Sequence, residues 1–312
     1  MAGTMRQRFV DVTSELLDTV GNLAVLTADL SAEMFSRARK RHPARVINVG
    51  IREQLLIGMT GGMSLVGMRP IAHSFAPFLI ERPFEQIKLD LNHQGVGAVL
   101  VSAGASYDIA SGGRTHQSPG DVALLSTLPD WTIHVPGHAD EAEAMLRDAA
   151  VRDDLIYIRL SNQSNRQPYA TPGSATAGSA TTGSGGLTTL RTGKQATVIA
   201  VGPLCDAVLE ATADLDVSVL YAATVRPFDG VTLRQSVADQ AVPRVVLVEP
   251  MLEGTSSAEV LRSLSGRPVS LLPLGVTREE LRYYGTSAQH AIAYGLDAAG
   301  LRRSISSFIS EQ

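Results

Sequence analysis

Short apolar runs alternate with amphipathic stretches along most of the chain. The apolar runs predict buried strands at residues 23–26, 46–50, 69–75, 98–101, 131–135 and 155–158, and again at 197–202, 217–220 and 245–248. Between them, apolar residues spaced three and four apart predict helices, among them 8–21, 53–66, 84–91, 141–150 and 205–215. Strands that alternate with helices are typical of mostly parallel, doubly wound sheets. We therefore predict an α/β fold.

The alternation is interrupted once. Between residues 170 and 186 almost every residue is Gly, Ala, Ser, Thr or Pro. Such a composition cannot bury enough apolar surface to order itself. We interpret 169–189 as a linker between a first α/β domain at 1–168 and a second at 190–312, and a length of 312 residues suits two domains.

Composition narrows the classes of function. The formal net charge of −4 gives no general attraction to nucleic acid. No apolar run approaches the roughly 18 residues that a membrane span needs. Cys205 is the only cysteine, which excludes an internal disulfide and fits a reducing compartment. Because the first residues also lack the apolar core of a signal peptide, we expect a cytoplasmic protein.

One stretch, Val-Ile-Asn-Val-Gly-Ile-Arg-Glu-Gln at residues 46–54, places an acid where ligands bind. The apolar run ends at Gly50, and the helical pattern that follows has Glu53 in its first turn. In open α/β sheets, ligands bind at the carboxyl ends of strands. An acid in a first turn also complements the helix macrodipole, so its position alone leaves a structural role open.

This stretch resembles the glutamate motif of the transketolase family of thiamine-diphosphate enzymes. The resemblance covers nearly the whole chain but only half of an ordinary transketolase, because residues 5–165 resemble the pyrimidine-binding domain and 190–312 the C-terminal domain. The family's diphosphate-binding domain precedes both and holds Mg²⁺ and diphosphate through a Gly-Asp-Gly motif, which does not occur here. The chain is therefore similar to the second subunit of a two-component transketolase. It is more distantly similar to deoxyxylulose-phosphate synthases and to the β subunits of 2-oxo acid dehydrogenases.

The resemblance implies a role for each matching residue in handling the cofactor. Glu53 matches the glutamate that favours the imino form of the aminopyrimidine, which then removes the thiazolium proton. Phe75 and Phe78 match aromatics that pack on the pyrimidine, although an ordinary core role is open for both. Asp29 matches an aspartate near the cofactor and could otherwise cap a helix. His116, in Thr-His-Gln, matches the histidine that faces the reacting carbonyl and the sugar hydroxyls, and its alternative is a loop hydrogen bond.

The positions that would recognise a sugar phosphate depart from the family. Gly112 replaces an acid that recognises a substrate hydroxyl, and Arg114 replaces a proline. Asn162 falls on the phosphate-binding arginine of Leu-Ser-Arg-Gln, and Glu33 falls near a phosphate-binding serine. Losing an arginine clamp removes several charge-assisted hydrogen bonds to phosphate, and Arg114 could restore an anion contact elsewhere.

Two further residues complete the substrate-binding candidates. Arg6 fits the position of another phosphate-binding arginine, with Arg8 as a near alternative. His73 stands where the family commonly has a small residue, so it is either an active-site group or a histidine at a strand end.

We expect the pyrimidine-binding subunit of a thiamine-diphosphate-dependent, transketolase-like enzyme that moves a two-carbon ketol unit to an aldehyde. The expected partner is a diphosphate-binding subunit that ligates Mg²⁺, and we expect no metal ligand in this chain. The expected assembly is a heterotetramer with two copies of each subunit. The substrates would be non-standard sugars or oxo acids. One alternative is a carbon–carbon ligase that decarboxylates a 2-oxo acid, and another is a non-catalytic paralogue that acts as a scaffold.

Overall fold

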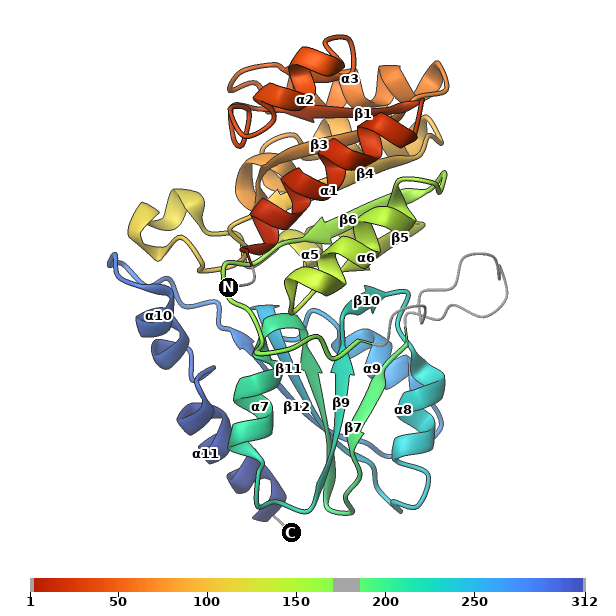
Figure 1. Ribbon diagram of the computed structural model, residues 1–312. Coiled ribbons are helices and arrows are strands. Elements are labelled where there is room, and N and C mark those ends of the chain that lie inside the picture. Colours follow the sequence, from red (N-terminus) through yellow and green to blue (C-terminus); the bar gives the residue numbers. More distant parts are fainter. Residues whose placement is uncertain (1–2, 171–185, 311–312) are drawn as a thin grey trace.

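The computed structural model describes residues 3–170 and 186–310, which form two β-sheets one after the other along the chain (Figure 1). Most strand pairs in both sheets are parallel, so the predicted α/β architecture is confirmed. Most of the predicted linker, residues 171–185, lies outside the described residues. No helix among the described residues is long and apolar enough to cross a membrane.

The first sheet has seven strands in the order β10-β5-β6-β4-β3-β1-β2. Its strands are β1 (Leu23–Thr27), β2 (Val46–Asn48), β3 (Arg69–Phe75), β4 (Ala98–Ala103), β5 (Trp131–His134), β6 (Leu155–Arg159) and β10 (Thr224–Arg226). Only β10, which comes from the second half of the chain, runs antiparallel to its neighbour β5. The first sheet is therefore completed by a strand from beyond residue 190.

Helices cover both faces of this sheet. They are α1 (Met5–Thr19), α2 (Ser36–Arg41), α3 (Glu53–Leu65), η1 (Pro77–Glu81), α4 (Phe84–Gln86), η2 (Ile87–His93), η3 (Ala110–Gly112), η4 (Arg114–His116), α5 (Asp121–Leu125) and α6 (Ala139–Ala149). Val25 and Leu26 are neighbours in β1 but belong to different apolar clusters, because successive strand residues point to opposite faces. The first cluster contains buried residues of α1 and α6, and the second those of α3, η1 and α5.

The second sheet has five strands in the order β12-β11-β8-β9-β7. They are β7 (Thr188–Arg191), β8 (Ala196–Val201), β9 (Val217–Ala222), β11 (Arg244–Leu252) and β12 (Ser270–Val276), and only β7 is antiparallel to its neighbour. The accompanying helices are η5 (Gly202–Leu204), α7 (Cys205–Ala211), α8 (Gly230–Ser236), α9 (Ser257–Ser263), α10 (Ser287–Ala293) and α11 (Ala298–Ser310). The same two apolar clusters continue here, with α7 and α11 on one face and α8 and α9 on the other.

Some details differ from the sequence predictions. β7 begins at Thr188, inside the stretch interpreted as linker, because Thr-Thr-Leu-Arg adds an edge strand to β9. In α3 the buried residues include Leu56 and Ile57, whereas Leu55 is 48% exposed and Val66, just past its end, is 78% exposed. The three-and-four spacing that predicts this helix includes Leu55, Leu56, Met59, Met63 and Val66 as one apolar face. That face is partly wrong, since only one side of α3 packs on the sheet.

Candidate active site

The strongest sequence candidates lie at one edge of the first sheet. Asp29, Glu53 and His116 follow the carboxyl ends of β1, β2 and β4, and Phe75 is the last residue of β3. These four strands are neighbours in the order β4-β3-β1-β2. Because they are parallel, the segments after them line the same edge, which is where ligands bind in sheets of this kind.

Glu53 is the first residue of α3 and is only 2% exposed. Gly50 makes the approach to the helix possible, because its φ of 70° lies in the left-handed region that favours glycine. The Glu53 Oε2 atom accepts a hydrogen bond of 2.7 Å from Nη1 of Arg82. Sequence reasoning missed Arg82, which is 29 residues away along the chain. Only the fold brings the acid and the arginine together.

Phe75, Phe78 and His116 form a cluster of three rings. The centroids of Phe75 and Phe78 lie 6.1 Å apart, and that of His116 lies 5.6 Å from Phe75 and 5.2 Å from Phe78. All three contacts are edge-to-face, the arrangement that aromatic quadrupoles favour. Arg82 joins this cluster to the acid, because its guanidinium carbon lies 4.1 Å from the centre of the Phe78 ring.

Asp29 is placed by a network around Asn48. The Asn48 side-chain oxygen accepts hydrogen bonds from the backbone N–H of Asp29 and of Gly50, at 2.9 and 3.1 Å. Its amide nitrogen donates to the Asp29 carboxylate at 2.8 Å. Asp29 has a φ of 61°, which is uncommon outside glycine, and the network holds this conformation. Asp29 therefore lies in the turn after β1 and does not cap a helix.

His73 is fully buried in β3 beside α1. Its Nδ1 lies 2.8 Å from the carbonyl of Val101, which can only accept, so Nδ1 donates and Nε2 accepts the 3.0 Å bond from the Ser31 hydroxyl. Burial lowers the pKa of His73 to about 4, and the ring stays neutral at pH 7. Its ring lies 4.5 Å from that of Phe9. These contacts fit a core histidine.

The structure separates the two candidate arginines at the start of α1. Arg8 donates to Asp140 at 2.8 Å and to Glu143 at 2.5 Å, and so ties α1 to α6. Arg6 makes no hydrogen bond or ion pair with any residue in the described ranges, and its charge acts on His73. Arg6 therefore remains available to a ligand, whereas Arg8 does not.

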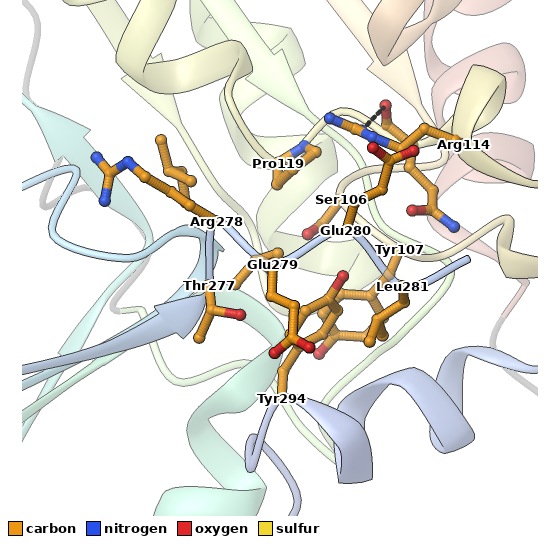
Figure 2. A pocket seen from close by; sticks show the side chains of 13 residues that line it. Ser106, Tyr107, Arg114, Pro119, Thr277, Arg278, Glu279, Glu280, Leu281 and Tyr294 are labelled. Carbon is orange, nitrogen blue, oxygen red and sulfur yellow. Dashed lines mark hydrogen bonds between the residues drawn. The ribbon is translucent and has the colours of Figure 1, made fainter. Parts of the chain in front are cut away.

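The two remaining substrate-binding candidates lie away from Glu53. The backbone N–H of Asn162 donates to Asp108 at 2.7 Å, and the Asn162 side chain is exposed. Arg114 lines a pocket of about 230 Å³ between the loop after β4 and the segment after β12. Figure 2 shows Arg114 at this pocket together with Ser106, Tyr107, Tyr294 and the segment from Thr277 to Leu281. Neither Glu53 nor His116 lines it.

Gly112 is packed against His116. A Cβ atom at Gly112 would lie 3.0 Å from Cγ of His116 and 3.0 Å from Cγ2 of Ile109. Both distances are shorter than ordinary contacts, so an acid at this position would require the histidine to move. The glycine that replaces the family's acid at position 112 therefore allows His116 to take its observed position.

These residues fit the pyrimidine half of thiamine diphosphate. Such a ring needs a sheltered carboxyl group and apolar walls, and Glu53 with Phe75 and Phe78 provides both. Among the described residues, no group of three or more His, Cys, Asp or Glu side chains could hold a metal ion.

Comparison with known proteins agrees with this geometry. Residues 2–168 match the family model of the transketolase pyrimidine-binding domain. A protein of Rhodococcoides fascians, described as an uncharacterized 33.6 kDa protein in the fasciation locus, is 48% identical over 96% of this chain and 93% of its own length. The 6-deoxy-6-sulfo-D-fructose transketolase subunit SqwH of Clostridium sp. (strain MSTE9) is 27% identical over 87% of this chain and 84% of its own length.

A solved structure gives the same result for the whole fold. It is described as a split gene transketolase in an inactive β4 tetramer, and it superposes with a TM-score of 0.81. The two chains are 28% identical and 99% of each is covered. The resemblance to split transketolases is therefore confirmed, and this chain belongs to the transketolase pyrimidine-binding domain family.

Proposed function

We propose that this chain is the pyrimidine-binding and C-terminal subunit of a two-component, thiamine-diphosphate-dependent enzyme that transfers a two-carbon ketol unit to an aldehyde acceptor. The observation that carries the proposal is Glu53, an acid that is 2% exposed and is linked through Arg82 to the cluster of the Phe75, Phe78 and His116 rings. A scaffold would have no need of a buried acid at this edge of the sheet. On this proposal residues 1–168 and 190–312 are the two domains.

Each residue then has one task at the cofactor. Thiamine diphosphate, when bound, supplies the carbon nucleophile that takes up the two-carbon unit. Glu53 holds a proton at a nitrogen of the pyrimidine ring, and Phe75 and Phe78 orient that ring and exclude water. His116 faces the reacting carbonyl, and Asp29, fixed by Asn48, lines the cofactor site from β1.

On this proposal the partner supplies the diphosphate site and its Mg²⁺, because the family's Gly-Asp-Gly motif does not occur in this sequence. Ile51 and Leu55 lie on either side of Glu53 in the sequence and are 69% and 48% exposed, so apolar side chains are uncovered next to the acid. Such surface favours burial against another polypeptide. The proposed assembly has two copies of each subunit and works in the cytoplasm.

The test of the proposal is Glu53→Gln in the complex with its partner. The amide keeps the shape of the side chain but cannot exchange a proton with the ring. Since positioned proton transfer contributes about 10²- to 10⁴-fold, we expect turnover at saturating cofactor to fall by that factor while the melting temperature changes little. Glu85→Gln removes an exposed acid nearby and serves as the control. Wild-type turnover in an assembled Glu53→Gln complex would refute the catalytic role.

We also propose that the substrate is not an ordinary ketose phosphate. Gly112 and Asn162 lack the acid and the guanidinium of the family, while Arg6, without a hydrogen bond or ion pair in the described ranges, is open to an anion of another kind. The relative from Clostridium is named for a sulfonated sugar, 6-deoxy-6-sulfo-D-fructose, and this supports the substrate proposal.

Competition between xylulose 5-phosphate and unphosphorylated or carboxylated sugars tests the substrate proposal. We expect kcat/KM to favour a substrate without phosphate by about tenfold or more, the effect of one lost charge-assisted clamp. A clear preference for the phosphate would contradict this proposal and leave the assignment of Glu53 untouched.

A further inference from the structure

Arg82 makes the two contacts that a pyrimidine ring would need. Its Nη1 donates to Oε2 of Glu53 at 2.7 Å, and its guanidinium carbon lies 4.1 Å from the centre of the Phe78 ring. The first contact occupies the Glu53 carboxylate, and the second covers the face of the Phe78 ring. The Arg82 side chain is 39% exposed, in contrast to 3% for Glu53, so the arginine lies at the mouth of the site and the acid at its floor.

The local backbone explains how Arg82 reaches the acid. Arg82 directly follows η1, a π-helix that begins at Pro77, and its N–H donates to the Pro77 carbonyl at 3.1 Å. The Gln54 side chain donates to the Arg82 carbonyl at 3.5 Å, which ties the end of η1 to the start of α3. Short π-helical turns are frequent at functional sites because they change where the following side chains point.

We propose that Arg82 is an exchangeable partner of Glu53, which the pyrimidine ring of the cofactor displaces from both the acid and the Phe78 face. Arg82 is thus a positioning residue that keeps the buried acid paired until the ring takes its place. The inference rests on the proposed function, because it assumes that thiamine diphosphate binds here. It adds a residue that neither the family motif nor the comparisons assign.

The exchange has a defined proton balance. A guanidinium pairs with a carboxylate, whereas a ring nitrogen that accepts a hydrogen bond needs a protonated carboxyl group. Each exchange therefore takes about one proton from solution onto Glu53 and returns Arg82, still charged, to water. Affinity for the cofactor should consequently weaken as pH rises, by at most about tenfold for each pH unit.

Few other charged groups surround the acid. Arg52 precedes it in the chain and is exposed, Asp90 of η2 faces α3 at Gly58, and His116 lies beyond Phe78. Within the described residues, Arg82 is the one hydrogen-bonding partner of the Glu53 carboxylate.

The experiment is calorimetry of thiamine diphosphate with Mg²⁺ binding to the assembled complex, for wild type, Arg82→Gln and Arg82→Met. We expect both variants to bind the cofactor about five- to tenfold more tightly, because no ion pair has to be broken. Titrations in two buffers of different ionisation enthalpy count the protons. Wild type should take up close to one proton, as the exchange requires.

Arg52→Gln is the matched control, because it removes a neighbouring positive charge without touching the pair. It should leave affinity and proton uptake as in wild type. Variants that bind the cofactor equally or more weakly would overturn the proposed exchange while leaving the function intact. A wild-type complex that binds no thiamine diphosphate would overturn both. Melting temperatures show whether each variant is folded.

Discussion

At the scale of single residues, His73 shows how the fold fixes a protonation state. The ring donates from Nδ1 to Val101 and accepts at Nε2 from Ser31, so both nitrogens are used by the neutral form. Burial lowers its pKa from 6.5 to about 4. His134 in β5 is also buried, and its pKa is likewise lowered to about 4. A proton on the His73 ring would be buried, and the charge of Arg6 acts against it.

This lowered pKa predicts how stability depends on pH. In the unfolded chain His73 takes up a proton below about pH 6.5, whereas the folded chain resists until about pH 4. Stability is therefore lost as pH falls from 6.5 towards 4, and this one histidine costs about 2 kcal/mol between pH 7 and pH 5. His73→Gln keeps a donor and an acceptor but does not titrate. Urea unfolding at both pH values should show a loss about 2 kcal/mol smaller for the variant, and equal losses would contradict the account.

The same scale shows what the sequence could and could not reveal about the site. Motif resemblance predicted Glu53, Phe75, Phe78 and His116 as site residues, and the structure brings the three rings together and links them to the acid through Arg82. Arg82 was missed because a cation becomes informative only when its partner is known, and that partner is 29 residues away. Likewise, Arg6 and Arg8 are equivalent in sequence and differ only because α6 presents Asp140 and Glu143 to one of them.

At the scale of elements, apolar runs correctly predicted the central strands. Each of these strands is buried on both faces, so its sequence is a continuous apolar run without alternating polar residues. The short strand β10 was not predicted, because Thr-Val-Arg is too brief to form a pattern and is fixed by pairing with β5. The helix predicted at 84–91 overlaps η2, whereas η1 was not predicted. Gly61 of α3 allows η2 to approach, since a Cβ there would lie 2.4 Å from the Asp90 carbonyl oxygen.

At the scale of the whole molecule, buried polar contacts join the two sheets. Arg159 of β6 is 1% exposed and pairs with Asp121 at 2.7 Å. The same guanidinium donates to the carbonyl of Pro250 in β11, at 3.2 Å, and to that of Ser118. One side chain thus contacts the first sheet, the loop that follows His116, and the second sheet. Arg159 and β10 together make the position of the loop that carries His116 depend on the second half of the chain.

This connection predicts that the two halves unfold as one unit. The chain carries a reporter in each half, because Trp131 in β5 is its only tryptophan and Cys205, buried at the start of α7, its only cysteine. In wild type, tryptophan fluorescence and thiol labelling should follow the same denaturation curve.

Arg159→Met leaves Asp121 buried without its cation, so both curves should shift together by about 3–5 kcal/mol. Arg147→Gln, which breaks ion pairs on the surface of α6, should cost less than about 1 kcal/mol. If Cys205 became labelled well before Trp131 changed its fluorescence, the halves would be independent, and the loop that carries His116 would be held by the first sheet alone.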